Sequence, residues 1–192
     1  MRPLLFAFLC AILLSSCGDY TYRAMALINE PTAAPDFVLT DQHGRMFQLS
    51  EARGTLVLLF FGFTNCPDVC PTTLADLAAV QRNLGADGDS VQIVLVTVDP
   101  ERDTAERLGR YANVFGPDIL ALRGTSAELE SVYRSFGIVA QRRDLPDSEL
   151  QYTIDHTSAV LVIDRQGQWV GMFGYGAPVA DLTSDVRHLV AQ

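Results

Sequence analysis

A long apolar segment, followed by a short turn and a helix, constrains this chain more than any other feature. The segment Leu56–Phe63 (LVLLFFGF) is almost continuously hydrophobic, which predicts a strand that is buried on both faces of a sheet. In Pro71–Leu84 the apolar residues recur at helical spacing. Between the two segments the chain reads CPDVCP. We therefore expect a strand, a turn at the carboxyl end of the sheet, and a helix.

The two cysteines of this turn, Cys66 and Cys70, predict a reactive or metal-binding site. The N-terminus of a helix favours a thiolate over a thiol. Pro71 disfavours the helical conformation for the residue before it, so we expect the helix to begin at Pro71 and CPDVC to form an irregular loop. Both sulfurs would then face one small space, where they could close a disulfide or bind a soft metal ion such as copper(I). A purely structural disulfide is the weaker interpretation, because closing so short a loop stabilises a fold little.

The first residues are typical of a targeting segment. Arg2 precedes the apolar run Leu4–Leu14, and two serines and Cys17 follow. The run is shorter than the 20 or so residues that a transmembrane helix needs. Its ending resembles a bacterial lipoprotein signal, so we predict that residues 1–17 are a lipoprotein signal peptide with Cys17 as the lipidation site. The alternative is ordinary signal cleavage, in which Cys17 is discarded or left unmodified.

This interpretation places the protein in the bacterial cell envelope, attached to a membrane by lipid and facing the periplasm. Removal of the signal peptide also removes Cys10, so only the pair in CPDVCP remains in the folded part. Residues 18–35 contain few periodic apolar residues and two prolines, and we predict that they form a flexible tether. Residues 36–192 are enough for one domain with a proper core.

The charge balance excludes one class of partner. The chain has 23 acidic residues, 14 arginines and no lysine, and its formal net charge is −9. Nucleic-acid binding needs a basic surface, so we expect no nucleic-acid partner. An acidic protein also binds anionic lipid poorly, so a membrane location would depend on the acyl anchor. We expect the protein to be a monomer.

Strands and helices alternate along the rest of the chain, which predicts an α/β fold with a mixed central sheet and helices on both of its faces. Alternating apolar residues around His43 and Gly44 predict an N-terminal β-hairpin within residues 36–51, with Phe37, Leu39, Phe47 and Leu49 on the buried side. The polar segment 141–151 should be an irregular loop. Further strands are expected at 91–98, 119–122, 159–163 and 169–173, a loop at 85–90, and helices at 104–115, 126–136 (with Ser126 as its cap) and 180–190.

One histidine is placed to join the cysteines. His156 lies just before the predicted strand 159–163, so its imidazole could reach the same end of the sheet. Two thiolates and one imidazole would form a three-coordinate site that suits copper and, with an added oxygen ligand, could hold either oxidation state. Taken alone, a single histidine is more often a surface or hydrogen-bonded core residue. We interpret His43, in a turn, and His188, on the last helix, as structural residues rather than ligands.

Three segments in the same order resemble the Sco/SenC family: CPDVCP after a hydrophobic strand, VTVDPERDT after the next strand, and DHTSAVLVIDRQG near the end. The similarity extends from about Ala34 to Gln192. This family consists of proteins with a thioredoxin-like fold from bacterial envelopes and mitochondrial inner membranes.

The resemblance implies a function and a site. Members bind copper through the two cysteines and the histidine of these segments, which correspond to Cys66, Cys70 and His156. They support assembly of the dinuclear copper site of cytochrome c oxidase as copper donors, as thiol reductants, or as both. We therefore expect one copper ion per chain, as Cu(I) or Cu(II), and a copper-receiving oxidase subunit or another envelope cuproprotein as partner. Asp99 or Asp103 would orient His156 or tune the site, although a carboxylate at the start of helix 104–115 is an equally good interpretation.

Two alternatives without a metal remain. The sequence Val69–Thr72 resembles the peroxidatic segment of peroxiredoxins, but such peroxidases need a cation near the thiol, and no arginine stands at residues 156–159. A general thiol-disulfide oxidoreductase has two residues between its cysteines and a cis-proline facing them. This chain has three intervening residues, and Ser158 lies near the place of that proline. Copper handling, by metal transfer, by thiol reduction or by both, is the function that we expect.

Overall fold

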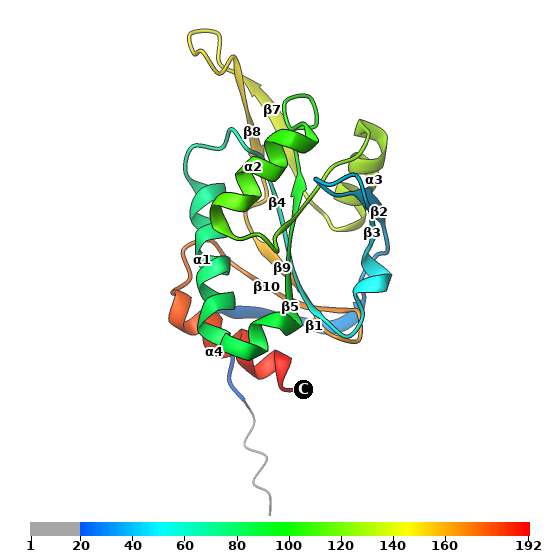
Figure 1. Ribbon diagram of the computed structural model, residues 1–192, viewed down its shortest axis with the longest axis vertical. Helices are drawn as coiled ribbons and strands as arrows, with labels where there is room; N and C mark the ends of the chain where they lie inside the picture. Colours follow the sequence, from blue (N-terminus) through cyan, green and yellow to red (C-terminus); the bar gives the residue numbers. More distant parts are fainter. Residues whose placement is uncertain (1–19) are drawn as a thin grey trace, which may run out of the picture.

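A six-stranded mixed sheet forms the centre of the molecule, in the order β1-β10-β9-β4-β5-β6 (Figure 1). The computed structural model describes residues 20–192. β4, β5 and β6 run parallel, whereas β9, β10 and β1 each run antiparallel to their neighbours. The elements are β1 (Met25–Ala33), β2 (Val38–Thr40), β3 (Met46–Gln48), η1 (Leu49–Ala52), β4 (Leu56–Gly62), α1 (Val69–Leu84), η2 (Gly85–Ser90), β5 (Val91–Thr97), α2 (Ala105–Phe115), β6 (Leu120–Leu122), α3 (Ser126–Ser135), β7 (Ala140–Asp144), β8 (Tyr152–His156), β9 (Val160–Ile163), β10 (Gln168–Phe173) and α4 (Val179–Val190).

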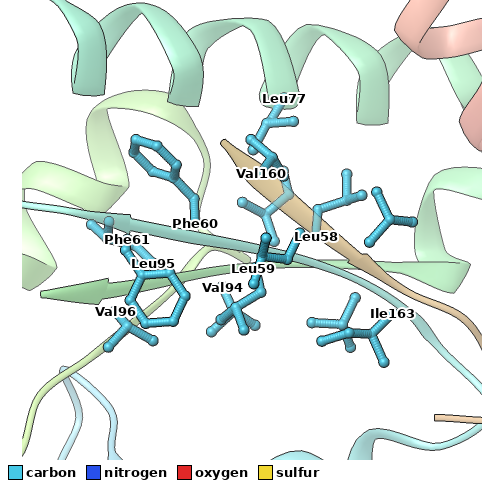
Figure 2. Packing of buried hydrophobic residues seen from close by; sticks show 14 of the residues in the cluster. Leu58, Leu59, Phe60, Phe61, Leu77, Val94, Leu95, Val96, Val160 and Ile163 are labelled. Atoms are coloured by element: carbon cyan, nitrogen blue, oxygen red, sulfur yellow. The ribbon is translucent and has the colours of Figure 1, made fainter. Parts of the chain in front are cut away.

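The hydrophobic segment that dominates the sequence is the central strand β4, and all seven of its residues are buried. Its side chains alternate between the two faces of the sheet (Figure 2). Leu58 and Phe60 point toward Leu77 of α1, and Phe61 points to the opposite face, where its ring contacts Tyr133 and Phe136 at the end of α3. The predicted mixed sheet with helices on both faces, a thioredoxin-like arrangement, is therefore confirmed.

The predicted N-terminal hairpin is also confirmed. β2 pairs antiparallel with β3, and Phe37, Leu39 and Leu49 are buried in the core, with Phe47 packed against it. The segment predicted as a loop at 85–90 is the 3-10 helix η2. The N-cap of α3 is Thr125 rather than the predicted Ser126. The Thr125 side chain accepts a hydrogen bond from the backbone N–H of Glu128, and the Glu128 carboxylate accepts one from the backbone N–H of Thr125.

The tether predicted for residues 18–35 is wrong for most of that segment. Residues 25–33 form the edge strand β1, which pairs with β10. Only Met25 of this strand is buried, so β1 lacks the apolar alternation that identifies a strand in sequence. Its position depends on backbone hydrogen bonds to β10 and on the buried carboxylate of Asp185. The predicted signal peptide and its lipidation site, Cys17, lie outside the described residues.

The irregular loop predicted at 141–151 is partly wrong too. Residues 140–144 form β7, which pairs with β8 in a separate two-stranded sheet. This hairpin projects from the end of the molecule that is opposite the C-terminus (Figure 1). All residues of β7 are exposed or partly exposed, so its sequence carries no hydrophobic pattern. Among residues 20–192, no helix combines the length and apolar character that crossing a bilayer requires.

Candidate metal centre

The cysteine turn connects β4 to α1. The helix begins at Val69, two residues earlier than predicted, so Cys70 lies in its first turn. Pro71 is tolerated there because the first four N–H groups of a helix have no partner within it. Cys70 is completely buried and Cys66 is partly exposed, and both are free thiols.

His156 is the last residue of β8, and its ring is held from two sides. It packs edge-to-face against Phe60 and Phe63, with centroids 6.2 and 5.7 Å away. Its Nδ1 donates to the carbonyl oxygen of Thr157 at 2.9 Å. A carbonyl can only accept, so Nδ1 carries a proton, and in the neutral ring Nε2 keeps its lone pair. That nitrogen lies 3.4 Å from the Sγ of Cys70.

Three residues that are far apart in the sequence therefore form one cluster. The Sγ atoms of Cys66 and Cys70 and a ring nitrogen of His156 all lie within 4.8 Å of one another. Val69, Ile154 and Ser158 line a hollow beside Cys66 and His156. The donor set fits a soft metal ion, because two thiolates and one imidazole are ligands that copper(I) prefers. The hollow leaves the cluster accessible from outside.

The two cysteines differ in acidity. The Cys70 thiol donates to the Cys66 sulfur and is the main reason that the pKa of Cys66 falls to about 4; burial opposes this effect, and the backbone amides of Cys70 and Asp68 add to it. The pKa of Cys70 is raised, first because it is the donor in this pair and second because it is buried. At neutral pH the pair therefore consists of one nucleophilic thiolate and one thiol.

Asp103 contacts the segment that precedes Cys66. It is completely buried and accepts from the hydroxyl groups of Thr64 and Thr97, each at 2.6 Å, and from the backbone N–H of Thr64. Burial raises the pKa of Asp103, and these hydrogen bonds offset only part of that effect. Arg107 donates to the Thr64 hydroxyl on the same loop. Asp103 therefore holds the segment that leads into Cys66.

Asp99 has a different set of partners. It pairs with Arg102 and accepts from the hydroxyl of Tyr152 at 2.7 Å. Within the described residues no hydrogen bond joins Asp99 or Asp103 to His156, whose Nδ1 contacts the Thr157 carbonyl, and tuning of the site by either carboxylate stays a prediction. The sequence pattern did not indicate the aromatic contacts of His156 or the role of Thr64. Phe60 and Phe63 are within the quoted hydrophobic segment, but a buried strand residue gives no sign of what its ring contacts.

Residues 26–191 match the protein family described as SCO1/SenC. This chain belongs to that family. It is 36% identical over 137 residues to the SCO2-like protein of Rickettsia typhi, covering 71% of this chain and 68% of the relative. It is 34% identical over 176 residues to the mitochondrial SCO2 homolog of Bos taurus, covering 91% of this chain and 66% of the relative. The chain spans about two thirds of the length of the curated relatives that it matches.

Solved Sco structures share the fold over nearly their whole length. Bradyrhizobium japonicum ScoI with copper bound superposes with a TM-score of 0.75 at 35% identity, covering 82% of this chain and 99% of that one. BsSco, described as having a disulfide switch and as a member of the Sco family of cytochrome c oxidase assembly proteins, gives a TM-score of 0.65 at 26% identity, covering 85% and 98%. A SCO1/SenC family lipoprotein from Bacillus anthracis gives 0.70 at 25% identity, covering 86% and 99%.

Proposed function

We propose that this protein binds one copper ion per chain through Cys66, Cys70 and His156 and delivers it during assembly of the dinuclear copper site of cytochrome c oxidase. The observation that carries the proposal is the cluster of two sulfurs and one imidazole nitrogen within 4.8 Å. Bradyrhizobium japonicum ScoI, which shares the fold, is a copper-bound protein. BsSco belongs to a family of oxidase assembly proteins, which supports an oxidase subunit as the acceptor.

The three side chains have distinct roles in this function. The Cys66 thiolate is partly exposed and ready to take the ion at neutral pH. Cys70 must lose its proton when it binds, so capture of copper weakens as the pH falls. His156 contributes Nε2, the ring nitrogen that is not engaged by the hydrogen bond to Thr157. Cysteines of an acceptor would reach the ion through the hollow beside Cys66 and exchange ligands one at a time.

The asymmetry of the dithiol favours a second activity at the same site, reduction of a disulfide in the acceptor. The Cys66 thiolate would attack one sulfur of that disulfide and release the other as a thiolate. The Cys70 thiol would then lose its proton and attack the Cys66 sulfur, which frees the second acceptor thiolate and leaves a Cys66–Cys70 disulfide. Two electrons pass from this protein to the acceptor, and copper binding is switched off until the pair is reduced again.

We further propose that the protein is a lipoprotein of the bacterial cell envelope, anchored through Cys17 and facing the periplasm. The charged start, short apolar run and cysteine of residues 1–17 support this location, as does the existence of a lipoprotein within the family. A Cys17→Ala variant should lose incorporation of labelled fatty acid and leave the membrane fraction. Retention of the label by that variant would place the modification elsewhere.

Copper titration of the reduced protein against a chromogenic copper(I) chelator tests the main proposal. Wild type should bind one equivalent, and Cys66→Ser, Cys70→Ser and His156→Ala should each bind it much more weakly. His43→Ala is the matched control, because His43 is exposed in the β2–β3 turn. A reduced wild-type protein that does not compete for copper would overturn the proposal. Peroxide turnover without metal would instead support the peroxidase alternative.

The same variants separate the two activities. His156→Ala should retain reduction of an oxidised peptide that carries two cysteines, because the imidazole is not part of the electron transfer. Cys70→Ser should stop at the mixed disulfide, which mass spectrometry detects. Complementation of an oxidase assembly defect by His156→Ala would then identify the reductase as the activity that matters.

A further inference from the structure

Two arginines stack on opposite sides of one tyrosine ring at the outer end of the paired strands β7 and β8, next to the turn of the hairpin. The guanidinium carbon of Arg102 lies 3.6 Å from the centroid of Tyr152, and that of Arg142 lies 3.8 Å from it. Arg142 belongs to the hairpin, whereas Arg102 belongs to the connection between β5 and α2. Tyr152 is the first residue of β8, the strand that ends at His156. The contact with Arg102 therefore joins the strand that carries His156 to the body of the protein.

Arg102 makes more than an aromatic contact with the hairpin. Its Nη1 donates to the backbone carbonyl oxygens of Leu150 and Tyr152 at 3.1 and 3.0 Å. Its Nε pairs with Asp99, and the same carboxylate accepts from the Tyr152 hydroxyl. Asp99 is 2% exposed and the Arg102 side chain 17%. Arg102, Asp99 and Tyr152 thus form a closed, mostly buried ring of contacts.

No strand pairing joins the hairpin to the central sheet, so side-chain contacts and packing position it. β7 and β8 are hydrogen-bonded to each other in a sheet separate from the six-stranded one. Tyr152 is the only fully buried residue among the ten residues of these two strands. Figure 1 shows the hairpin extending away from the central sheet. Its orientation therefore depends on packing at its base, including that of the His156 ring, and on the contacts of Arg102 at the outer end of the paired strands.

We propose that Arg102 is a positioning residue for copper binding: it fixes β8 against the connection between β5 and α2 and so keeps His156 within reach of the two sulfurs before copper arrives. This inference rests on the proposed copper site. Arg102 also lies 6.0 Å from the centroid of Phe63, whose ring contacts the imidazole. If the hairpin moves freely, His156 is in place for only a fraction of the time, and the apparent dissociation constant rises by the inverse of that fraction.

The test uses Arg102→Gln, with Arg102→Lys as a conservative variant and Arg142→Gln as the matched control. Gln removes the stacked charge and the Nη1 group that donates to two carbonyls. We expect copper(I) affinity to fall about 10- to 100-fold, as for other groups that orient a ligand. Lys keeps the ion pair with Asp99 and should recover part of the loss. Arg142 is half-exposed, and its ion pair with Glu101 of the β5–α2 connection lies at the surface, where such pairs contribute little, so its loss should change affinity less than about threefold.

A double-mutant cycle with His156→Ala separates positioning from a general loss of stability. If Arg102 acts through His156, Arg102→Gln should have no further effect on copper affinity once the imidazole is absent. Hydrogen exchange of the β8 backbone amides should accelerate in Arg102→Gln without copper. An unchanged affinity in Arg102→Gln, or an equal loss in the His156→Ala background, would overturn the inference. If Arg102→Gln does not fold, Arg102→Lys and its own cycle with His156→Ala decide the question. A wild-type protein that binds no copper would instead refute the proposed function.

Discussion

Replacing the buried carboxylate of Asp185 by an amide is a small chemical change that should strongly destabilise the fold. Asp185 lies on α4, is completely inaccessible to solvent, and accepts from the backbone N–H groups of residues 23–25 and from the hydroxyl of Tyr20 at 2.8 to 3.0 Å. It thereby holds the segment that leads into β1. Burial acts to raise the pKa of Asp185, but these hydrogen bonds outweigh it, and the pKa is lowered overall. We predict that Asp185→Asn costs about 2 to 4 kcal/mol at pH 7.

The magnitude follows from the donors. Asn offers one acceptor oxygen, which can stay at the position of Oδ2 and serve the three amides of residues 23–25. Its NH2 group then faces the Tyr20 hydroxyl, which can turn its proton toward Ser184, 2.9 Å away. Each remaining hydrogen bond loses the charge of its acceptor, a change of about 1 kcal/mol per bond. The three remaining bonds together lose about 3 kcal/mol, within the predicted range and a large part of the 5 to 15 kcal/mol or so that stabilises a typical domain.

Urea unfolding at several pH values measures the effect and its cause. Because the folded pKa of Asp185 lies below the unfolded value of about 3.9, its contribution is fully present above pH 4 or so and is lost as the pH falls through the folded pKa. Wild type and Asp185→Asn should therefore differ at pH 7 and converge in acid. Asp147→Asn, at the exposed tip of the β7–β8 hairpin, should stay within about 0.5 kcal/mol of wild type.

Asp103 provides the contrasting case. It is equally buried, but its pKa is raised, so the fold disfavours its charged form. Asp103→Asn can keep an oxygen toward Thr64 and donate its NH2 to the hydroxyl of Thr97. We expect it to cost less than about 1 kcal/mol. Equal losses in Asp185→Asn and Asp103→Asn at pH 7, or an Asp185→Asn loss that does not change with pH, would refute the reasoning.

Three further predictions concern the site and the core. Gly62→Ala should lower stability by about 1 to 3 kcal/mol and weaken copper binding, since its Cβ would lie 2.8 Å from Phe60 and 3.0 Å from the Sγ of Cys70; a copper titration and urea unfolding measure both. Because the pKa of Cys66 is lowered to about 4 and that of Cys70 is raised, copper binding should release about one proton between pH 7 and 8 or so. Calorimetry in buffers of different ionisation enthalpy counts the released protons. Release of two protons would contradict the assignment of Cys66 as a thiolate. Leu59→Ala, at a completely buried position of β4, should cost about 2 to 5 kcal/mol in urea unfolding and leave the copper affinity unchanged.

The sequence predicted those parts of the fold where side chains meet the core. Leu56–Phe63 and Val91–Val98 are recognisable as central strands because burial on both faces requires an unbroken apolar run. β1 and β7 are held by backbone hydrogen bonds and by single polar contacts, and neither needs apolar residues at alternate positions. The missed strands are therefore those whose stability comes from partners that are remote in the sequence.

The same distinction applies to the site. Cys66 and Cys70 are recognisable because their spacing, the preceding strand and the following helix are all local. His156 could be predicted as a ligand from its position before a strand and from the family resemblance, and the structure places it beside the sulfurs. The residues that keep it there could not be predicted, because the contacts of Arg102 with Tyr152 and with the carbonyl of residue 150 bring together segments about 50 residues apart.

The distribution of burial within the cluster is suited to transfer more than to storage. Cys70 is completely buried at the start of α1, whereas Cys66 and His156 are partly exposed beside a hollow. A storage or structural metal site closes its coordination with protein ligands, and an open side is what admits an incoming group. In the transfer that we propose, the thiolates of an acceptor would replace the accessible thiolate and imidazole first, while the buried sulfur would keep the ion in place until the last exchange. Because the imidazole is already oriented by Thr157, capture of the next ion needs little rearrangement, and the same open side serves both entry and exit.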